Sequence, residues 1–385
     1  MDLKIFFDVI DTDPAVWVND PYSVGNQIMR HTNGFPDWKS ADIALIGLVE
    51  ERGTLTNKGA EKGAEPIRQA LYSLKKGTGS YRIADLGNLR CGLGLEDSYL
   101  RIKEVCEVLL SHQVLPILFG GTHDLDYGQY IAYEKFDKLI NVLSVDSLLD
   151  MEGSDAKGME SHHTHRLMVH DPNFLFHFTN LGYQAYLNDM ATTEVLEKLS
   201  FERFRVGQVR ENISEMEPVI RNADLLSFDI SAIKQSDAPG NANATPFGLT
   251  GEEACQICWY AGFNEKLSSA GFYGYNPDLD FRNGTAKVTG TMIWYLIEGY
   301  YHRKHDLDFM SQDFTKFIVN LPQEPHIITF YKSLKTEKWW MEVPFPTGKN
   351  KYARVSIVPC SYSDYQTACG GELPVRWVNT VGKLI

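Results

Sequence analysis

Acidic and histidine side chains gather in three short segments of this chain, each of which follows an apolar run. The segments are Gly120-Gly121-Thr122-His123-Asp124, Asp146-Ser147-Leu148-Leu149-Asp150 and Ser227-Phe228-Asp229-Ile230-Ser231. One imidazole and several carboxylates form a hard, oxygen-rich ligand set, which suits Mn²⁺, Mg²⁺ or Ca²⁺ better than a structural Zn²⁺. The alternative is that these acids close turns at strand ends and bind nothing. Carboxylates buried together would then have raised pKa values, because like charges cannot all ionise in one site.

The apolar runs are predicted to be strands of a mostly parallel sheet. Runs rich in Val, Ile and Leu span 41–49, 81–86, 114–119, 139–145 and 224–230, and a weaker run spans 271–275. Amphipathic helices are expected between them, for example at 65–76 and 99–111. Apolar strands separated by helices predict an α/β fold with helices on both faces of the sheet. Ligands of such sheets bind beyond the carboxyl ends of the strands, where all three segments fall.

Length and composition narrow the class of protein. With 385 residues, 43% of them hydrophobic and 23% charged, the chain can bury the large core of a globular protein. Its net charge of −13, without any Lys/Arg stripe, argues against nucleic acid or an anionic membrane surface as a partner. No apolar run approaches about 18 residues, and the start lacks a basic segment followed by a long apolar stretch. We therefore expect a cytoplasmic protein.

The six cysteines are too dilute for a disulfide scaffold in a chain of this length. Cys255 and Cys258 form a C-x-x-C pair, but they follow the capping-box sequence Thr250-Gly251-Glu252-Glu253. They should therefore lie one turn apart within an amphipathic helix. Because no second cysteine pair or histidine lies at zinc spacing, we expect them to pack in the core.

The three segments resemble the metal-binding segments of the ureohydrolase family, which includes arginase, agmatinase and formimidoylglutamase. In that family they read roughly GGDHS, DAHxD and SxDxDxxDP, and they supply six ligands to two Mn²⁺ ions that share a bridging hydroxide. Other motifs resemble the family in the right order across residues 36–305, such as Gly63-Ala64-Glu65-Pro66-Ile67-Arg68 and Ala238-Pro239-Gly240. The run Arg205-Val206-Gly207-Gln208-Val209-Arg210 is most similar to formimidoylglutamase. The resemblance implies the three-layer α/β fold of arginase.

Aligned with that family, the chain retains four of the six metal ligands: His123, Asp146, Asp150 and Asp229. Leu148 stands where the family has its second histidine, and Ser231 stands where it has its last aspartate. In the family those two groups bind one of the ions alone, whereas the four retained groups form the whole protein shell of the other ion. The resemblance therefore implies at most one Mn²⁺. Positions 122 and 231, which are acidic in the family, are Thr122 and Ser231 here. Their replacement removes negative charge beside the ion that this chain is expected to lack.

Proton transfer is assigned by the same resemblance to His162. The segment Ser161-His162-His163-Thr164-His165 is similar to a family loop of the form SHGT, in which the histidine moves protons or faces the substrate. An imidazole suits general acid/base work near neutral pH. Two alternatives stay open: one of the neighbouring histidines, which include His170 and His177, completes an altered metal shell, or the loop is merely solvated.

Two further positions bear on the chemistry. Asp124 caps the helix that follows it, acts as a displaced metal ligand or orients His123, and the cap is the expected role. The family's glutamate that holds the cationic end of the substrate corresponds here to Gly274. A guanidino or formimino group would therefore lose its charge partner at that position.

Three parts of the chain are expected: an N-terminal extension at 1–35, a ureohydrolase-like α/β domain at 36–305 and a β-rich C-terminal extension at 306–385. Strand-like runs at 326–331 and 339–343 lie in the last part, which is rich in aromatic residues. It either packs on the edge of the sheet or presents a surface for a partner.

Two functions remain open from the sequence. One is a hydrolase of a C–N bond in a linear, small-molecule amidine similar to formimidoylglutamate, agmatine or arginine, which uses at most one Mn²⁺. The other is a catalytically inactive family member that binds a partner. A homo-oligomer is also expected from the family. A deacetylase on the same fold is not favoured, because Leu148 removes the histidine of its Asp-x-His ligand pair.

Overall fold

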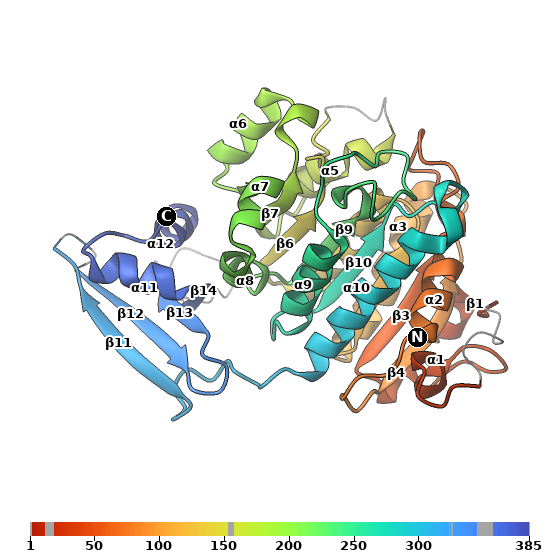
Figure 1. The fold of residues 1–385 in the computed structure, drawn as a ribbon, viewed down its shortest axis with the longest axis horizontal. Helices are drawn as coiled ribbons and strands as arrows, with labels where there is room; N and C mark the ends of the chain where they lie inside the picture. The colour runs from red at the N-terminus through yellow and green to blue at the C-terminus, as the bar shows by residue number, and fades with distance from the viewer. Residues whose placement is uncertain are drawn as a thin grey trace.

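The computed structural model describes residues 2–11, 19–152, 158–322, 324, 326–344 and 357–384, and its main body is built on a ten-stranded sheet (Figure 1). Apart from the antiparallel pair β1–β4, the paired strands of this sheet are parallel. The prediction of a mostly parallel sheet is confirmed. The strand order is β1 (Phe7–Asp8), β4 (Ile83–Leu89), β3 (Ile43–Leu48), β5 (Leu115–Gly120), β10 (Ser269–Tyr273), β9 (Leu225–Asp229), β6 (Ile140–Val145), β7 (Leu175–Tyr183) and β8 (Glu202–Arg205), with β2 (Met29–Arg30) beside β4.

Helices cover both faces of this sheet. Alternate side chains of its fully buried strands point to opposite sides, so both faces are apolar and must be covered. Ile43 and Leu45 of β3 enter one core cluster, and Ala44 and Ile46 enter another. The helices that contribute to the first cluster are α1 (Val24–Gln27), α2 (Ala64–Ser73), α7 (Val206–Glu211), α8 (Glu217–Ile220), α9 (Gly251–Gly262) and α10 (Gly284–Tyr301). The opposite face carries α3 (Leu95–Ser111), α4 (Asp126–Ile131), α5 (His163–Val169) and α6 (Met190–Lys198).

A fully buried ion pair ties α2 to β4. The Arg68 Nε lies 2.9 Å from Asp85 Oδ2, and neither side chain is exposed. The hydroxyl of Tyr72 donates to the same carboxylate oxygen at 2.8 Å. Two further side chains that contact the guanidinium are Glu65 and Asn88. Because each partner satisfies buried polar atoms of the others, this group fixes the helix on the sheet.

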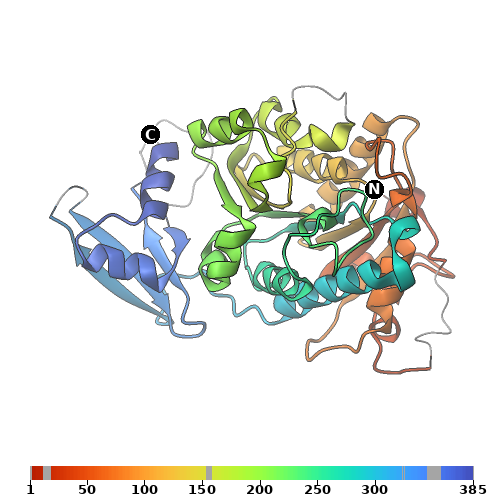
Figure 2. The same ribbon diagram turned by 45° about the horizontal axis from the view of Figure 1, so that its top comes forward.

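The C-terminal part forms a sheet of its own, which lies beside the main body on the side of β6 and β7 (Figures 1 and 2). The sheet is antiparallel, with its own aromatic core: the rings of Trp339 and Tyr365 stack with centroids 4.8 Å apart. Its elements are β11 (Phe314–Asn320), β12 (Ile327–Ser333), β13 (Trp339–Glu342), β14 (Ile357–Cys360), α11 (Tyr362–Cys369) and α12 (Val375–Leu384).

The C-x-x-C pair lies inside α9, as its capping box predicts. Thr250 and Glu253 form that box, and Cys258 is buried in the core while Cys255 packs against it. All six cysteines are free thiols. Within the described residues, no helix is both long and apolar enough to span a membrane.

Candidate metal centre and catalytic site

The carboxyl ends of β5, β6 and β9 position the predicted ligands side by side. His123 follows β5 after a sharp turn at Gly120 and Gly121, whose φ angles are +91° and +68°. A Cβ at Gly121 would lie 2.5 Å from a Leu125 methyl, so a glycine permits both this backbone and this packing. Asp146 comes directly after β6, and Asp229 is the last residue of β9.

Three carboxylate oxygens surround the Nδ1 atom of His123. The distances from Nδ1 are 2.9 Å to Asp146 Oδ2, 3.6 Å to Asp229 Oδ2 and 3.8 Å to Asp150 Oδ2. All four residues are buried, and among the described residues Nδ1 has no partner with hydrogen-bond geometry. An unsatisfied imidazole nitrogen among hard oxygen donors fits a divalent cation such as Mn²⁺.

The other nitrogen of His123 belongs to a buried polar network that returns to the same carboxylates. His123 Nε2 lies 2.8 Å from Ser227 Oγ, which donates to Asp126 Oδ2 at 2.8 Å. Asp126 Oδ1 lies 2.9 Å from His163 Nδ1, and His163 Nε2 lies 3.3 Å from Asp150 Oδ2. Buried partners of this kind fix the orientation of a metal-binding imidazole.

His163 belongs to the cluster that the structure brings closest together. One ligand atom from each of four residues falls within 4.8 Å of every other, and these residues are His123, Asp146, Asp150 and His163. Of the histidines in the 161–177 region, His163 is thus the one placed to complete an altered shell. Asp229 lies outside this tight group but, at 3.6 Å, still faces His123.

Burial has the largest effect on the protonation of the carboxylates in this site. Burial, followed by the neighbouring carboxylates, raises the pKa of Asp146 and of Asp150 to about 7, and burial also raises the pKa of Asp229. Burial alone would lower the pKa of His163, but Asp126 and Asp150 together raise it well above its usual value. Without a metal, the cluster therefore holds protons near neutral pH that a bound cation would displace.

Leu148 and Ser231, which the family resemblance aligns with two ligand positions, form hydrogen bonds with the carboxylates of the site. The Ser231 hydroxyl donates to Asp146 Oδ1 at 3.2 Å, and the backbone N–H of Ser231 donates to Asp229 Oδ1 at 2.6 Å. The backbone N–H of Leu148 also donates to Asp146 Oδ1, at 2.9 Å. Asp146 and Asp229 therefore each turn one oxygen to His123 and accept hydrogen bonds from the protein with the other.

His162 lies apart from this cluster. Its Nδ1 is hydrogen-bonded to the backbone carbonyl of Glu152, and its ring packs against His165 with centroids 4.8 Å apart. It does not line the cavity that His123, Asp146, Asp150 and Asp229 line. His170 and His177 lie elsewhere, where His170 contacts Tyr127 and His177 contacts Glu202.

Asp124 does not cap the following helix. The residue at the N-cap of α4 is Leu125, and no side-chain cap bond is made there. Asp124 is instead buried and accepts a hydrogen bond of 2.5 Å from the Tyr99 hydroxyl. The expectation of a cap was wrong because a one-turn 3-10 helix, His123–Leu125, precedes α4 and places Asp124 inside the core.

No side chain fits at Gly274 beside the metal cluster. Its φ is +79°, and a Cβ there would lie 2.7 Å from Asp229 Oδ2 and 2.8 Å from Asn241 Nδ2. The carbonyl of Gly274 also accepts hydrogen bonds of 2.8 Å from Asn57 and Asn241. The backbone is thus held where a glutamate cannot stand, and a cationic group bound beside the cluster would need another carboxylate as its partner.

The cavity next to the cluster contains such a carboxylate, on Glu160. The cavity has a volume of about 410 Å³ and is lined by His123, Asp146, Asp150 and Asp229 together with Leu148, Ser231 and Glu160. Thr54 and Thr56 donate to Glu160 Oε1. Burial, together with the charges of Asp229, Asp124 and Asp150, raises the pKa of Glu160 to about 7.

Sequence reasoning missed the roles of Asp126, His163 and Glu160. The density of histidines around position 163 was a signal, but it did not say which histidine turns inward. Glu160 lies in no recognisable motif, and only the fold shows that it shares a cavity with the metal cluster.

Comparison with known proteins finds similarity over about two thirds of the chain. The Arginase family model matches residues 41–298. The formimidoylglutamases of Bacillus subtilis and Streptococcus pyogenes are 24% and 26% identical over 285 and 288 residues, which cover 68% of this chain and 89% and 85% of theirs.

Solved structures show the same fold. A Trypanosoma cruzi formiminoglutamase with Mn²⁺ superimposes with a TM-score of 0.64 at 22% identity, over 69% of this chain and 95% of its own. The formimidoylglutamase of Bacillus subtilis gives a TM-score of 0.66 at 22% identity, over 73% of this chain and 92% of its own. Both confirm the arginase-type fold expected from the sequence.

Proposed function

The chain belongs to the Arginase family, and on that premise we propose that it is a metal-dependent hydrolase of a C–N bond in a linear amidine. The observation that carries the proposal is the unsatisfied Nδ1 of His123 among three carboxylate oxygens, at the edge of a cavity of about 410 Å³. The similarity to formimidoylglutamases supports a formimino or related amidine group as the substrate's reactive end.

His123, Asp146, Asp150 and Asp229 would hold one Mn²⁺, and His163 is the additional group in reach. A divalent ion bound there supplies Lewis-acid activation of water near neutral pH. Asp126 and Ser227 hold the imidazole of His123 in the orientation that keeps Nδ1 directed at the carboxylates. The Mn²⁺ reported for the Trypanosoma cruzi relative supports the choice of ion.

Glu160 takes the role that Gly274 cannot fill. Its carboxylate lines the same cavity as the ligands and is oriented by two threonine hydroxyls. An amidinium group in the cavity would pair with it, because charge-assisted hydrogen bonds are strong where water is excluded. The bound cation would also favour the ionised form of Glu160.

A proton must reach the leaving nitrogen when the C–N bond breaks. The two groups proposed for this transfer are Glu160, which lines the cavity and has a pKa of about 7, and His162, which the family resemblance assigns but which lies outside the cavity lining. Replacing each residue by glutamine distinguishes their roles. Loss of the group that moves the proton should lower kcat, whereas loss of a purely binding group should raise KM.

The test combines metal analysis with turnover. Protein purified with Mn²⁺ should contain about one ion per chain by elemental analysis, and it should hydrolyse one of formimidoylglutamate, agmatine or arginine. Asp229→Ala should remove both the ion and the activity. Glu160→Gln should lower kcat/KM about 10- to 100-fold, the effect of losing a hydrogen bond to a charged group, while the exposed Glu194→Gln should change nothing. Absence of bound metal in the wild type would overturn the proposal and favour a non-catalytic role.

A further inference from the structure

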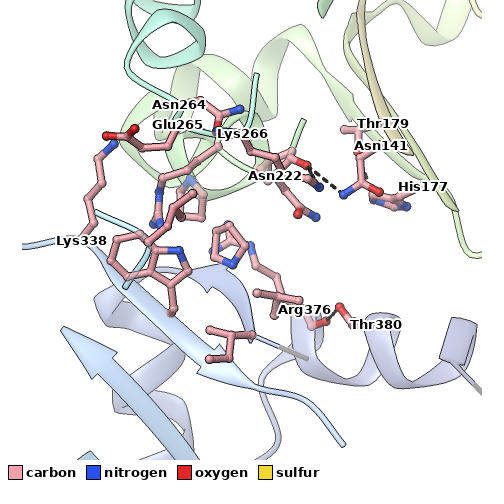
Figure 3. A pocket seen from close by; sticks show the side chains of 18 of the residues that line it. Asn141, His177, Thr179, Asn222, Asn264, Glu265, Lys266, Lys338, Arg376 and Thr380 are labelled. Carbon is pink, nitrogen blue, oxygen red and sulfur yellow. Dashed lines mark hydrogen bonds between the residues drawn. The ribbon is translucent and has the colours of Figure 1, made fainter. Parts of the chain in front are cut away.

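A second cavity lies between the main sheet and the C-terminal part of the chain (Figure 3). Its volume is about 250 Å³. Asn141 and His177, near the amino ends of β6 and β7, line one side, and Arg376 and Thr380 of α12 line the other. The cavity thus lies at the amino ends of these strands, whereas the proposed metal ligands follow the carboxyl ends of the strands in the same sheet.

The walls of this cavity are largely apolar and aromatic. The rings of Phe309 and Trp340 meet edge to face with centroids 5.4 Å apart. Other apolar side chains from the main body complete the walls: Leu139, Phe176, Val219 and Phe263. Small-molecule sites typically combine walls of this kind with a few polar groups that orient the ligand.

The charged groups at the cavity are mainly cationic. Seven Lys and Arg side chains line it against three carboxylates, in a chain whose net charge is −13. Two carboxylates behind the lining are each shared by two cations: Asp224 lies 2.6 Å from Lys138 and 3.0 Å from Lys266, and Glu217 lies 2.9 Å from Arg221 and 3.0 Å from Lys338. Burial lowers the pKa of Lys266 and of Lys338, against the opposing effects of Asp224 and Glu217.

Arg221 carries an unused donor at this place. Its side chain is 5% exposed, and its guanidinium carbon lies 4.2 Å from the Trp340 ring centroid. Nε donates to Glu217, and Nη2 donates to the carbonyls of Trp339 and Cys360 at 3.0 and 3.3 Å. Nη1 has no hydrogen-bond partner within the part of the chain that the structure describes. Buried guanidinium N–H groups normally have an acceptor.

We propose that this cavity binds a small organic carboxylate with a flat apolar body. The carboxylate accepts from Arg221 Nη1, and the flat body lies against Trp340 and Phe309. An inorganic anion would leave the aromatic walls unused, and a neutral ring would leave the guanidinium unpaired. The site is separate from the metal cluster, so its occupancy does not depend on the proposed hydrolase activity.

Binding to the full chain tests this proposal directly. The probes are benzoate and indole-3-acetate, with benzamide as the neutral counterpart and inorganic phosphate as the anion without a ring. Saturation-transfer NMR and calorimetry should show binding of the carboxylates at least about tenfold tighter than of benzamide or phosphate. Metal-free and Mn²⁺-loaded protein should bind alike.

Substitutions on α12 locate the ligand. Thr380→Trp places a large side chain in the cavity and should weaken carboxylate binding at least about tenfold. Val378→Trp, on the same helix but 47% exposed and outside the lining, should leave binding unchanged. Arg221→Gln should abolish the preference for benzoate over benzamide, with its fold checked by circular dichroism.

Four results would overturn the proposal: no carboxylate binding at about 10 mM, a concentration that detects weak ligands; equal binding of benzoate and benzamide; phosphate bound as tightly as benzoate; or full binding by Thr380→Trp. The Thr380→Trp variant keeps the test decisive even if Arg221→Gln fails to fold.

Discussion

Asp126 lies 2.9 Å from His163 through one carboxylate oxygen and reaches His123 through Ser227 with the other. One buried acid therefore orients both histidines of the metal cluster. Neither hydrogen-bond partner of Asp126 is local in sequence, since His163 comes 37 residues and Ser227 comes 101 residues after it.

Replacing this acid should weaken metal binding without removing a direct ligand. Asp126→Asn keeps the size of the side chain but loses the charge that raises the pKa of His163. We expect the Mn²⁺ dissociation constant to rise about 10- to 100-fold, as for other residues that orient metal ligands. Titration monitored by the electron paramagnetic resonance of free Mn²⁺ measures it. Asp124→Asn, a buried neighbour bonded to Tyr99, is the matched control, and equal losses in both variants would contradict the role of Asp126.

The stability of the metal-free protein should rise as pH is lowered from about 8 to about 6.5. The folded-state pKa values of Asp146 and Asp150, about 7, lie above the ordinary value of 3.8. The folded state therefore binds protons more tightly than the unfolded state in this window, and ionisation above it destabilises the fold. His163, whose pKa is also raised, acts in the same direction.

Thermal unfolding at a series of pH values, with a chelator and with Mn²⁺, measures the direction of this pH dependence of stability. With Mn²⁺ bound, the stability should instead fall as pH is lowered, because protons compete with the ion. Asp150→Asn should flatten the metal-free profile. A metal-free protein that loses stability on acidification across this window would refute the description of the cluster.

Restoring the two absent family ligands should create a second ion site. Leu148 and Ser231 line the same cavity as the cluster, and the Ser231 hydroxyl lies 3.2 Å from Asp146 Oδ1. The double variant Leu148→His with Ser231→Asp should raise the Mn²⁺ content from about one to about two ions per chain by elemental analysis. Each single variant serves as a control and should stay near one. An unchanged content in the double variant would show that these segments are misaligned with the family.

The ion pair between Arg68 and Asp85 should be essential for stability. Asp85→Ala leaves a buried guanidinium without its main partner and should lower the free energy of unfolding by about 3–5 kcal/mol. Urea denaturation measures the change. Lys62→Ala breaks the exposed pair with Asp278 and should have no measurable effect. Similar effects of both variants would contradict the structural role of the buried pair.

The sequence analysis predicted only some strands of the ten-stranded sheet. The prediction located β3, β4, β5, β6, β9 and β10 because their apolar runs are continuous. It missed the two-residue strands β1 and β2, and it missed β7 and β8, in which His177, Thr179, Glu202 and Arg203 interrupt the apolar pattern. His177, Thr179 and Glu202 lie where the sheet meets the C-terminal part, and Arg203 pairs with Glu197 of α6, so these side chains have polar partners.

By itself, the sequence determined the α/β fold, the family and the strand ends that carry His123, Asp146 and Asp229, because apolar periodicity and short motifs are local properties. Only the tertiary structure decided which side chains share a space. It turned His163 inward and His162 outward, placed Glu160 in the cavity, and packed Gly274 against Asp229. Those choices depend on contacts between residues far apart in the chain, which local patterns do not encode.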